Sequence, residues 1–295
     1  MNSIVFWSIG VVIVNLVIAL FAIVSGRFLQ GILFATDVKD QLDNKDNLAF
    51  GLSIAAGIVA IGLVMSAAVS GEAHVSLVEE ALNVIVYAVT GIILLKVGLV
   101  VVDKLIFTSV NIKQQLLSKN TSYGVINAAN LVAIGVLIAA AIGWVEDDSW
   151  RGVPGTVVIF IISLLVIGFV SVIRRTVYSS RHEGNQWQLA LITNPALAVR
   201  YAGQLVGSAI VIAAASGLIE YHTDVTSLAV AGLTWLIYAI IGVVVLWLLF
   251  RLTLPVVLYK IDVVEEVDNQ KNIGIASIEA SIYIAFAIII NMMLS

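Results

Sequence analysis

Charged side chains inside apolar stretches are the first candidates for chemistry in this sequence. Lys96, Arg200, Arg251 and Glu279 each lie within a run that is otherwise apolar, where an ionised group costs a few kcal/mol to insert into a bilayer. Lys96 and Glu279 are opposite in sign and lie deeper than the two arginines, and glutamate is too short to reach the headgroups. We therefore predict that Lys96 and Glu279 form an ion pair. Arg200 and Arg251 either belong to the same polar layer or extend their guanidinium groups to the lipid headgroups.

Uncharged polar residues add to this layer. Asn47, Asn127 and Asn130 are expected at the depth of the charges, and Tyr87 and Tyr238 nearer the opposite surface. A tyrosine at such a position more often bonds a neighbouring helix than a ligand, so packing is the alternative role for both. The charged and uncharged residues together form the predicted intramembrane polar site.

Two short segments could bind a divalent cation. Glu72 and His74 are separated by one residue, and so are Glu220 and His222; in an extended segment this spacing places both side chains on one side. Two imidazoles and two carboxylates would suit zinc or another transition metal. We predict a metal site at the outer face if the two segments meet there, and solvated loop residues if they do not.

Several classes of function find no support in the sequence. It has no cysteine, which removes disulfides, thiolate metal sites and cysteine nucleophiles. It contains no GxSxG or HExxH motif and no paired aspartates within the apolar runs, so an intramembrane enzyme is the weakest hypothesis and we expect no catalytic residues. No basic patch is interleaved with aromatic residues, so nucleic acid is not an expected partner.

The elements that must position the polar residues are membrane-spanning helices. Of the 295 residues, 61% are hydrophobic and 12% are charged, whereas soluble domains carry roughly 25% charged residues. Several apolar runs are as long as the roughly 20 residues that cross a bilayer. The sequence therefore predicts an all-α, polytopic membrane protein whose main partner is the lipid bilayer. Eight spans are expected, at residues 4–24, 48–70, 76–102, 122–142, 153–173, 195–219, 227–254 and 272–294.

Local patterns predict where some of these helices begin and end. Ser76 followed by Glu79 is typical of a capping box, and Asn194-Pro195 is typical of a helix cap followed by proline at the first helical position. Pro255 is expected to end the seventh span. Residues 27–45 have the mixed composition of an interfacial helix.

The spans fall into two copies of one unit. Tyr87-Ala88 followed by Gly91 recurs as Tyr238-Ala239 followed by Gly242, and other pairs keep the same separation of about 150 residues, which indicates an internal duplication. We assign residues 1–145 to the first four-helix membrane repeat and residues 146–295 to the second. The predicted Lys96–Glu279 pair would then cross the interface between the copies.

The distribution of positive charge predicts how the chain is inserted. Lys and Arg concentrate in the first, third, fifth and seventh loops, so these loops should face the cytoplasm and both termini should be extracytoplasmic. With four spans in each copy, the two repeats insert in the same direction and are parallel.

Short motifs near the helix starts point to a known family. Asp46-Asn47-Leu48-Ala49-Phe50 precedes the second span, and residues 120–124 open the fourth with Asn and then Gly. With the paired four-span layout, these motifs resemble the YjfL-like bacterial inner-membrane family, DUF350. The resemblance implies a multi-pass protein of the bacterial inner (cytoplasmic) membrane with no established activity. The second copy departs from the pattern, with Asn194-Pro195 where the first has Lys45-Asp46.

Two functional hypotheses follow. In the first, the protein is a channel or transporter for a small ion or solute, with a polar cytoplasmic vestibule between the repeats. In the alternative, it is a non-transporting membrane platform that recruits cytoplasmic partners in an envelope-stress or lipid-related system. Ion flux in liposomes would support the first hypothesis. Crosslinking of the loops to soluble proteins would support the second. Assembly into an oligomer is compatible with either.

Overall fold

Long helices make up most of the part of the chain that the computed structural model describes, which is residues 2–34, 36–71, 76–108, 110–145, 149–182 and 187–294. No strand occurs in these ranges. Eight helices are long and apolar enough to cross a membrane, and they coincide with the eight predicted spans. They are α1 (Asn2–Phe34), α2 (Leu48–Ala68), α3 (Leu77–Leu105), α5 (Thr121–Gly143), α6 (Val153–Ser179), α8 (Pro195–Ala213), α9 (Val225–Val257) and α10 (Ile273–Leu294).

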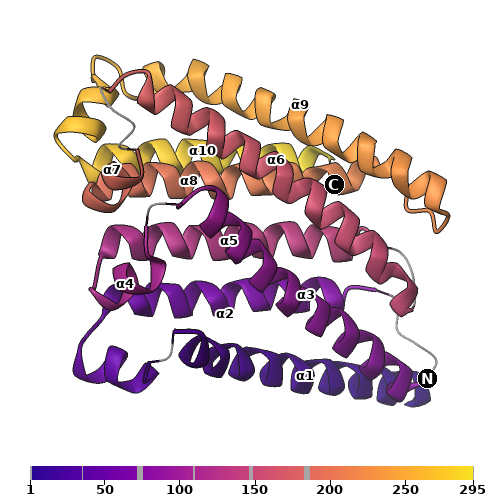
Figure 1. The fold of residues 1–295 in the computed structure, drawn as a ribbon. Helices are drawn as coiled ribbons and strands as arrows, with labels where there is room; N and C mark the ends of the chain where they lie inside the picture. Colours follow the sequence, from indigo (N-terminus) through magenta and orange to yellow (C-terminus); the bar gives the residue numbers. More distant parts are fainter. Residues whose placement is uncertain are drawn as a thin grey trace.

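Short helical elements gather at the two ends of the bundle. At one end lie η1 (Asp40–Asn44), α4 (Ile112–Leu117), α7 (Trp187–Thr193) and η4 (Glu265–Asn269), which we call the short-helix end (Figure 1). At the other end lie η2 (Trp150–Gly152) and η3 (Ala214–Leu218). The second, fourth, sixth and eighth spans are α2, α5, α8 and α10. All four begin at the short-helix end, so they run in the same direction.

Small residues let the main helix pairs approach closely. In the first repeat α5 packs on α2, where a Cβ added at Gly135 would lie only 2.8 Å from the Cα of Ala60. In the second repeat α10 packs on α8, where a Cβ added at Gly203 would clash with Ala280. Backbones at this distance gain extensive van der Waals contact, which is the main force between helices in lipid. Small residues thus form the closest helix contact in each repeat.

The helix caps show how the two repeats correspond. Asn47 caps α2 and its Nδ2 donates to the carbonyl oxygen of Leu116 at 2.8 Å. Asn194 caps α8 and its Nδ2 donates to the carbonyl oxygen of Val267, also at 2.8 Å. Asn194 is therefore the counterpart of Asn47, and the predicted match with Lys45-Asp46 was wrong by two residues.

A second pair of caps fixes the correspondence of the last span in each repeat. Asn120 accepts a hydrogen bond from the backbone N–H of Tyr123, and Asn272 accepts one from that of Ile275. Each asparagine follows a lysine with positive φ, 63° at Lys119 and 58° at Lys271. α5 and α10 are therefore equivalent from their first residues onward.

The repeats meet where α5 packs on α8, and α5 lies between α2 and α8 in Figure 1. Near the short-helix end the interface contains an aromatic cluster of Phe107, Trp187, Tyr201 and Tyr123, with ring centroids of neighbouring members 5.7–6.2 Å apart. Asn120 donates across the interface to the carbonyl oxygen of Ile192 at 3.0 Å. This seam is packed with side chains.

Two local predictions are corrected and two are confirmed. α1 continues to Phe34 instead of ending before an interfacial helix, because no proline interrupts residues 24–34. Pro255 lies inside α9, which ends at Val257, since spanning helices tolerate proline better than soluble ones. Ser76 accepts a hydrogen bond from the N–H of Glu79 and caps α3, and Asn194 caps α8 before Pro195 as predicted.

Candidate functional site

Arg200 is the centre of a buried charged cluster in the second repeat. Its Nε donates to Oε2 of Glu279 at 2.6 Å, one Nη donates to Oδ1 of Asp268 at 2.5 Å, and the other donates to the carbonyl oxygen of Val263 at 3.0 Å. The side chains of Arg200, Asp268 and Glu279 are 13%, 2% and 5% exposed. Charge-assisted bonds to all three guanidinium nitrogens compensate the cost of burying the charges.

This cluster overturns the predicted ion pair between Lys96 and Glu279. Glu279 is bonded to Arg200 instead, and Lys96 is exposed on α3. The reason is packing: the close contact of α8 with α10 at Gly203 and Ala280 brings Arg200 to Glu279, whereas α3 packs mainly on α1, α2, α5 and α6. The guanidinium group of Arg200 is held by the two carboxylates.

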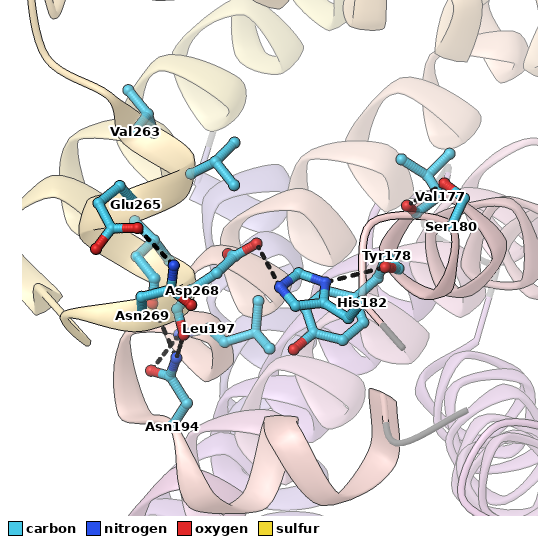
Figure 2. Close-up of polar contacts among 12 residues, drawn as sticks. Val177, Tyr178, Ser180, His182, Asn194, Leu197, Val263, Glu265, Asp268 and Asn269 are labelled. Carbon is cyan, nitrogen blue, oxygen red and sulfur yellow. Dashed lines mark hydrogen bonds and ion pairs between the residues drawn. The ribbon is translucent and has the colours of Figure 1, made fainter. Parts of the chain in front are cut away.

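The loop that carries Asp268 is held in place by the α8 cap. Nδ2 of Asn194 donates to the carbonyl oxygens of Val267 and Asp268 at 2.8 and 3.2 Å. His182 approaches from the end of α6, with Nε2 3.7 Å from Oδ2 of Asp268, and its ring stacks on Tyr178 with centroids 4.1 Å apart. Figure 2 shows Asp268 lying between Asn194 and His182. Asp268 is thus positioned by contacts from two other segments.

Arg174 of α6 is a further cation, half-buried, and sequence reasoning missed it. One terminal nitrogen donates to Oγ of Ser208 at 2.7 Å, to the carbonyl oxygen of Gln204 at 2.9 Å and to the hydroxyl of Tyr283 at 3.2 Å. The other terminal nitrogen, Nη1, is buried without a hydrogen-bond partner among the described residues. The fifth span was expected to end at residue 173, but α6 continues to Ser179, which leaves Arg174 more than one turn inside the helix.

A cavity of about 350 Å³ joins these residues. It lies among α6, α7, α8, α9 and α10, within the second repeat rather than between the repeats as the sequence suggested for a polar vestibule. Four arginines line it, Arg174, Arg181, Arg200 and Arg251, together with the carboxylates of Asp268 and Glu279. Apart from Gln204, the rest of its wall is apolar or aromatic.

Arg251 occupies the α9 side of this cavity. Its guanidinium carbon lies 5.7 Å from the ring centroid of Trp247 on the preceding turn, a cation–π contact. Arg251 is exposed, so of the two arginines predicted from the sequence only Arg200 is enclosed by carboxylates.

The first repeat has no charges at the equivalent positions. Counted from the caps, Ser53 corresponds to Arg200 and Asn127 to Glu279, and Nδ2 of Asn127 donates to Oγ of Ser53 at 2.7 Å. In the same way Ile61 corresponds to Ser208. The duplication thus keeps a bond between the paired helices but makes it neutral in one copy and ionic in the other.

The remaining predicted polar residues are dispersed through the structure. Asn47 is a buried cap, and Asn130 is buried with no partner for Oδ1 within the described part of the chain. Tyr87 is buried and donates to the carbonyl oxygen of Ser149 at 3.2 Å. Tyr238, its counterpart in the sequence, is exposed. These residues do not form one site with Arg200 and Glu279.

The predicted metal ligands are only half described. Glu72 and His74 lie outside the described residues. Glu220 and His222 are exposed, with Nε2 of His222 4.0 Å from Oε2 of Glu220. No cluster of three His, Asp or Glu side chains suited to a metal occurs in the described ranges. The shared metal site stays a prediction.

Comparison with known proteins places both repeats in one family. A family model described as Domain of Unknown Function (DUF350) matches residues 4–142 and again residues 148–294. No curated protein and no solved structure matches the chain. The two matched ranges agree with the four-helix repeats defined by the caps.

Proposed function

Because this chain belongs to the DUF350 family, a family described by no activity, we propose its function from the geometry of the second repeat. This multi-pass membrane protein binds an anionic amphipathic molecule, such as one with a phosphate group and an acyl chain, in the cavity among α6, α8, α9 and α10. Binding is the recognition step of a transporter for that molecule. The proposal makes specific the small-solute hypothesis drawn from the sequence.

The excess of positive charge in the cavity is the observation that carries the proposal. Both carboxylates, Asp268 and Glu279, are engaged by Arg200. In the described part of the chain no carboxylate lies within 4.0 Å of the three other lining arginines, Arg174, Arg181 and Arg251. Positive charge in a site of low dielectric attracts anions strongly, and a guanidinium group matches phosphate or carboxylate geometry.

Arg174 presents a donor that the protein leaves unused. Nη1 is buried and unpartnered, and an unmet buried donor costs about 1–3 kcal/mol. The opposite edge of the same guanidinium is fixed by Ser208 and Tyr283. An anionic oxygen bound in the cavity would satisfy Nη1 once a small side-chain movement exposed this nitrogen.

The apolar side of the cavity indicates an amphipathic ligand. Ile173 and Val177 of α6 and Val244 and Trp247 of α9 line it and are also exposed on the outside of the bundle. The outside of a spanning helix contacts acyl chains, and basic pockets between spanning helices are known to bind lipid headgroups. This arrangement supports lateral entry between α6 and α9, with the anionic group reaching the arginines and the apolar part left in the bilayer.

Native mass spectrometry of the purified protein tests binding. Phosphatidic acid, phosphatidylcholine with the same acyl chains, hexyl phosphate and inorganic phosphate are added in separate arms. We expect phosphatidic acid and hexyl phosphate to bind more tightly than phosphatidylcholine, and inorganic phosphate to bind weakly. The Arg174→Gln variant should lose about tenfold in affinity, since a hydrogen bond to a charged group contributes about 1.5–3 kcal/mol.

Lys104→Gln is the matched control, because Lys104 is an exposed cation at the short-helix end of the first repeat. Equal binding of the neutral and anionic lipids, or equal losses for the two variants, would reject the anion site. Transport is tested separately with hexyl phosphate flux into liposomes. Binding without protein-dependent flux would reject the transporter and leave the binding site.

A further inference from the structure

One face of α10 and one face of α2 lack the partners that their counterparts have. α5 uses two opposite faces: Gly124 and Gly135 pack on α2, and the other face packs on α8. α10 is equivalent to α5 and packs on α8 through the same first face. Most of its second face is exposed, because the row of parallel helices ends there (Figure 1).

The second face of α5 is a stripe of buried residues. It consists of Ile126, Asn130, Ala133, Leu137 and Ala141, which lie on one side of the helix and point away from the glycines that contact α2. The equivalent stripe on α10 is Ile278, Ile282, Ala285, Ile289 and Met293. Ile289 is 52% exposed and Met293 is 78% exposed.

The same comparison applies to α8 and α2. One face of α8 points away from the cavity and toward α5. It carries Ala198, Ala202, Leu205, Ala209 and Ala213, and all of these except Ala202 are buried. The equivalent residues on α2 are Gly51, Ala55, Ile58, Gly62 and Ser66, and none of them is buried. A Cβ added at Gly62 would meet no atom within 4 Å, so this face of α2 is open.

The two open faces have the same complementary shapes as the packed pair. The α8 stripe is mostly alanine, and the α5 stripe that covers it contains Ile126 and Leu137. The α2 stripe is likewise small, with Gly51 and Gly62, and the α10 stripe carries three isoleucines and a methionine. Larger side chains on one helix thus face small ones on the other in both cases, which is the arrangement that helix association in lipid favours.

We propose that copies of this protein associate head to tail in the membrane, with α10 of one copy packed on α2 of the next in the manner of α5 on α8. α2 and α10 both begin at the short-helix end, so copies inserted in the same direction present the two faces at the same depth. Such an interface is heterologous, and it builds a ring if the rotation closes or a row if it does not. The inference does not depend on the ligand of the cavity.

Disulfide crosslinking tests this interface directly, because the chain has no cysteine. The hydrogen bond from Asn120 to Ile192 sets the start of α5 level with that of α8, and the same register places Ala285 of one copy between Ile58 and Gly62 of the next. We expect Ile58→Cys combined with Ala285→Cys to give a ladder of dimers, trimers and larger species in oxidised native membranes. α5 and α8 lie between α2 and α10 within one chain, so this pair cannot crosslink internally.

Three controls make the outcome decisive. Ile58→Cys combined with Ile241→Cys, a lipid-facing residue of α9, should give no ladder. Coexpression of the two single variants, Ile58→Cys and Ala285→Cys, should give dimers and nothing larger. Gly62→Trp added to the crosslinking pair should reduce the ladder at least fivefold while the circular dichroism of the purified protein stays helical. Equal ladders with the α9 pair, or dimers from either single variant alone, would overturn the proposal.

Discussion

Asn127 occupies in the first repeat the place that Glu279 occupies in the second, and each bonds the residue six positions after the cap of the neighbouring helix. Asn127 bonds Ser53 with 2.7 Å between Nδ2 and Oγ, and Glu279 bonds Arg200 with 2.6 Å between Oε2 and Nε. The two repeats therefore keep the helix pairing and change only its charge. This relationship makes the first repeat an internal reference for the second.

The ion pair should be strongly coupled in a double-mutant cycle. Glu279→Asn removes one of the two carboxylates around Arg200, and breaking a buried pair costs about 3–5 kcal/mol. Arg200→Ser combined with Glu279→Asn recreates the neutral pair of the first repeat, so the double variant should be less destabilised than the sum of the single variants by at least about 1 kcal/mol. Thermal unfolding in detergent measures this. Additive shifts in melting temperature would contradict the coupling.

Asn194 and Asn47 should differ in function although each caps a helix and donates to a backbone carbonyl before the last span of its repeat. Loss of either cap by substitution with alanine costs about 1 kcal/mol, and the lost bond to the loop carbonyl adds about 1 kcal/mol. Asn194→Ala also releases the loop that carries Asp268, so it should weaken phosphatidic acid binding severalfold. Asn47→Ala should leave binding unchanged at a similar melting temperature. If Asn47→Ala lost as much binding as Asn194→Ala, the loss would reflect lower stability and would contradict a specific role of Asn194.

Arg174→Lys should weaken ligand binding more than Arg251→Lys. Arg174 uses one edge of its guanidinium for Gln204 and Ser208 and leaves the other for a ligand, whereas a lysine ammonium cannot make both sets of bonds in a fixed plane. Arg251 makes a cation–π contact with the Trp247 ring, which lysine can keep. We expect about a tenfold loss for Arg174→Lys and less than threefold for Arg251→Lys by native mass spectrometry. The reverse order would place the anion on the α9 side.

The start of α9 should become less protected in acid. Oδ2 of Asp224 accepts a hydrogen bond from the N–H of Ser227 at 2.8 Å, and this bond holds the pKa of the Asp224 carboxyl below its ordinary value. Since the folded-state pKa is the lower one, the cap stabilises the helix above the unfolded-state pKa of about 4 and is lost as the pH falls through the folded value. Hydrogen exchange at Ser227 should therefore accelerate in acid relative to the intrinsic rate. Asp224→Asn should remove this pH dependence, and Ser76, the uncharged cap of α3, provides a reference.

Composition and local patterns were enough to predict the spans, the duplication and several caps. The length of an apolar run shows whether a segment can cross a bilayer. Helix caps such as Ser76 and Asn194 are recognisable from a few adjacent residues. The partner of Glu279 was not predictable in the same way, because depth in the membrane does not determine which helices touch. That choice is made by the contact of Gly203 with Ala280, and Lys96 lies at a similar depth on a helix that packs elsewhere.

A better alignment of the repeats would have found the pair. Aligning the capping asparagines, Asn47 with Asn194 and Asn120 with Asn272, places Arg200 opposite Ser53 and Glu279 opposite Asn127. The separation of about 150 residues places Glu279 opposite Ala129 instead, because it rests on apolar identities that recur throughout spanning helices. Arg174 was missed because a pair of arginines at the end of an apolar run is also typical of a helix end.

The second repeat has Arg200 and Glu279 where the first has Ser53 and Asn127. This difference breaks the symmetry between the two repeats. A protein made of two identical single-repeat chains would carry either two charged cavities or none. Joining the repeats in one chain removes that constraint, since each copy can change without its twin. Among the described residues the charged cavity lies in the second repeat, and the equivalent positions of the first repeat form the neutral bond between Asn127 and Ser53. The proposed ligand should therefore saturate at one molecule per chain.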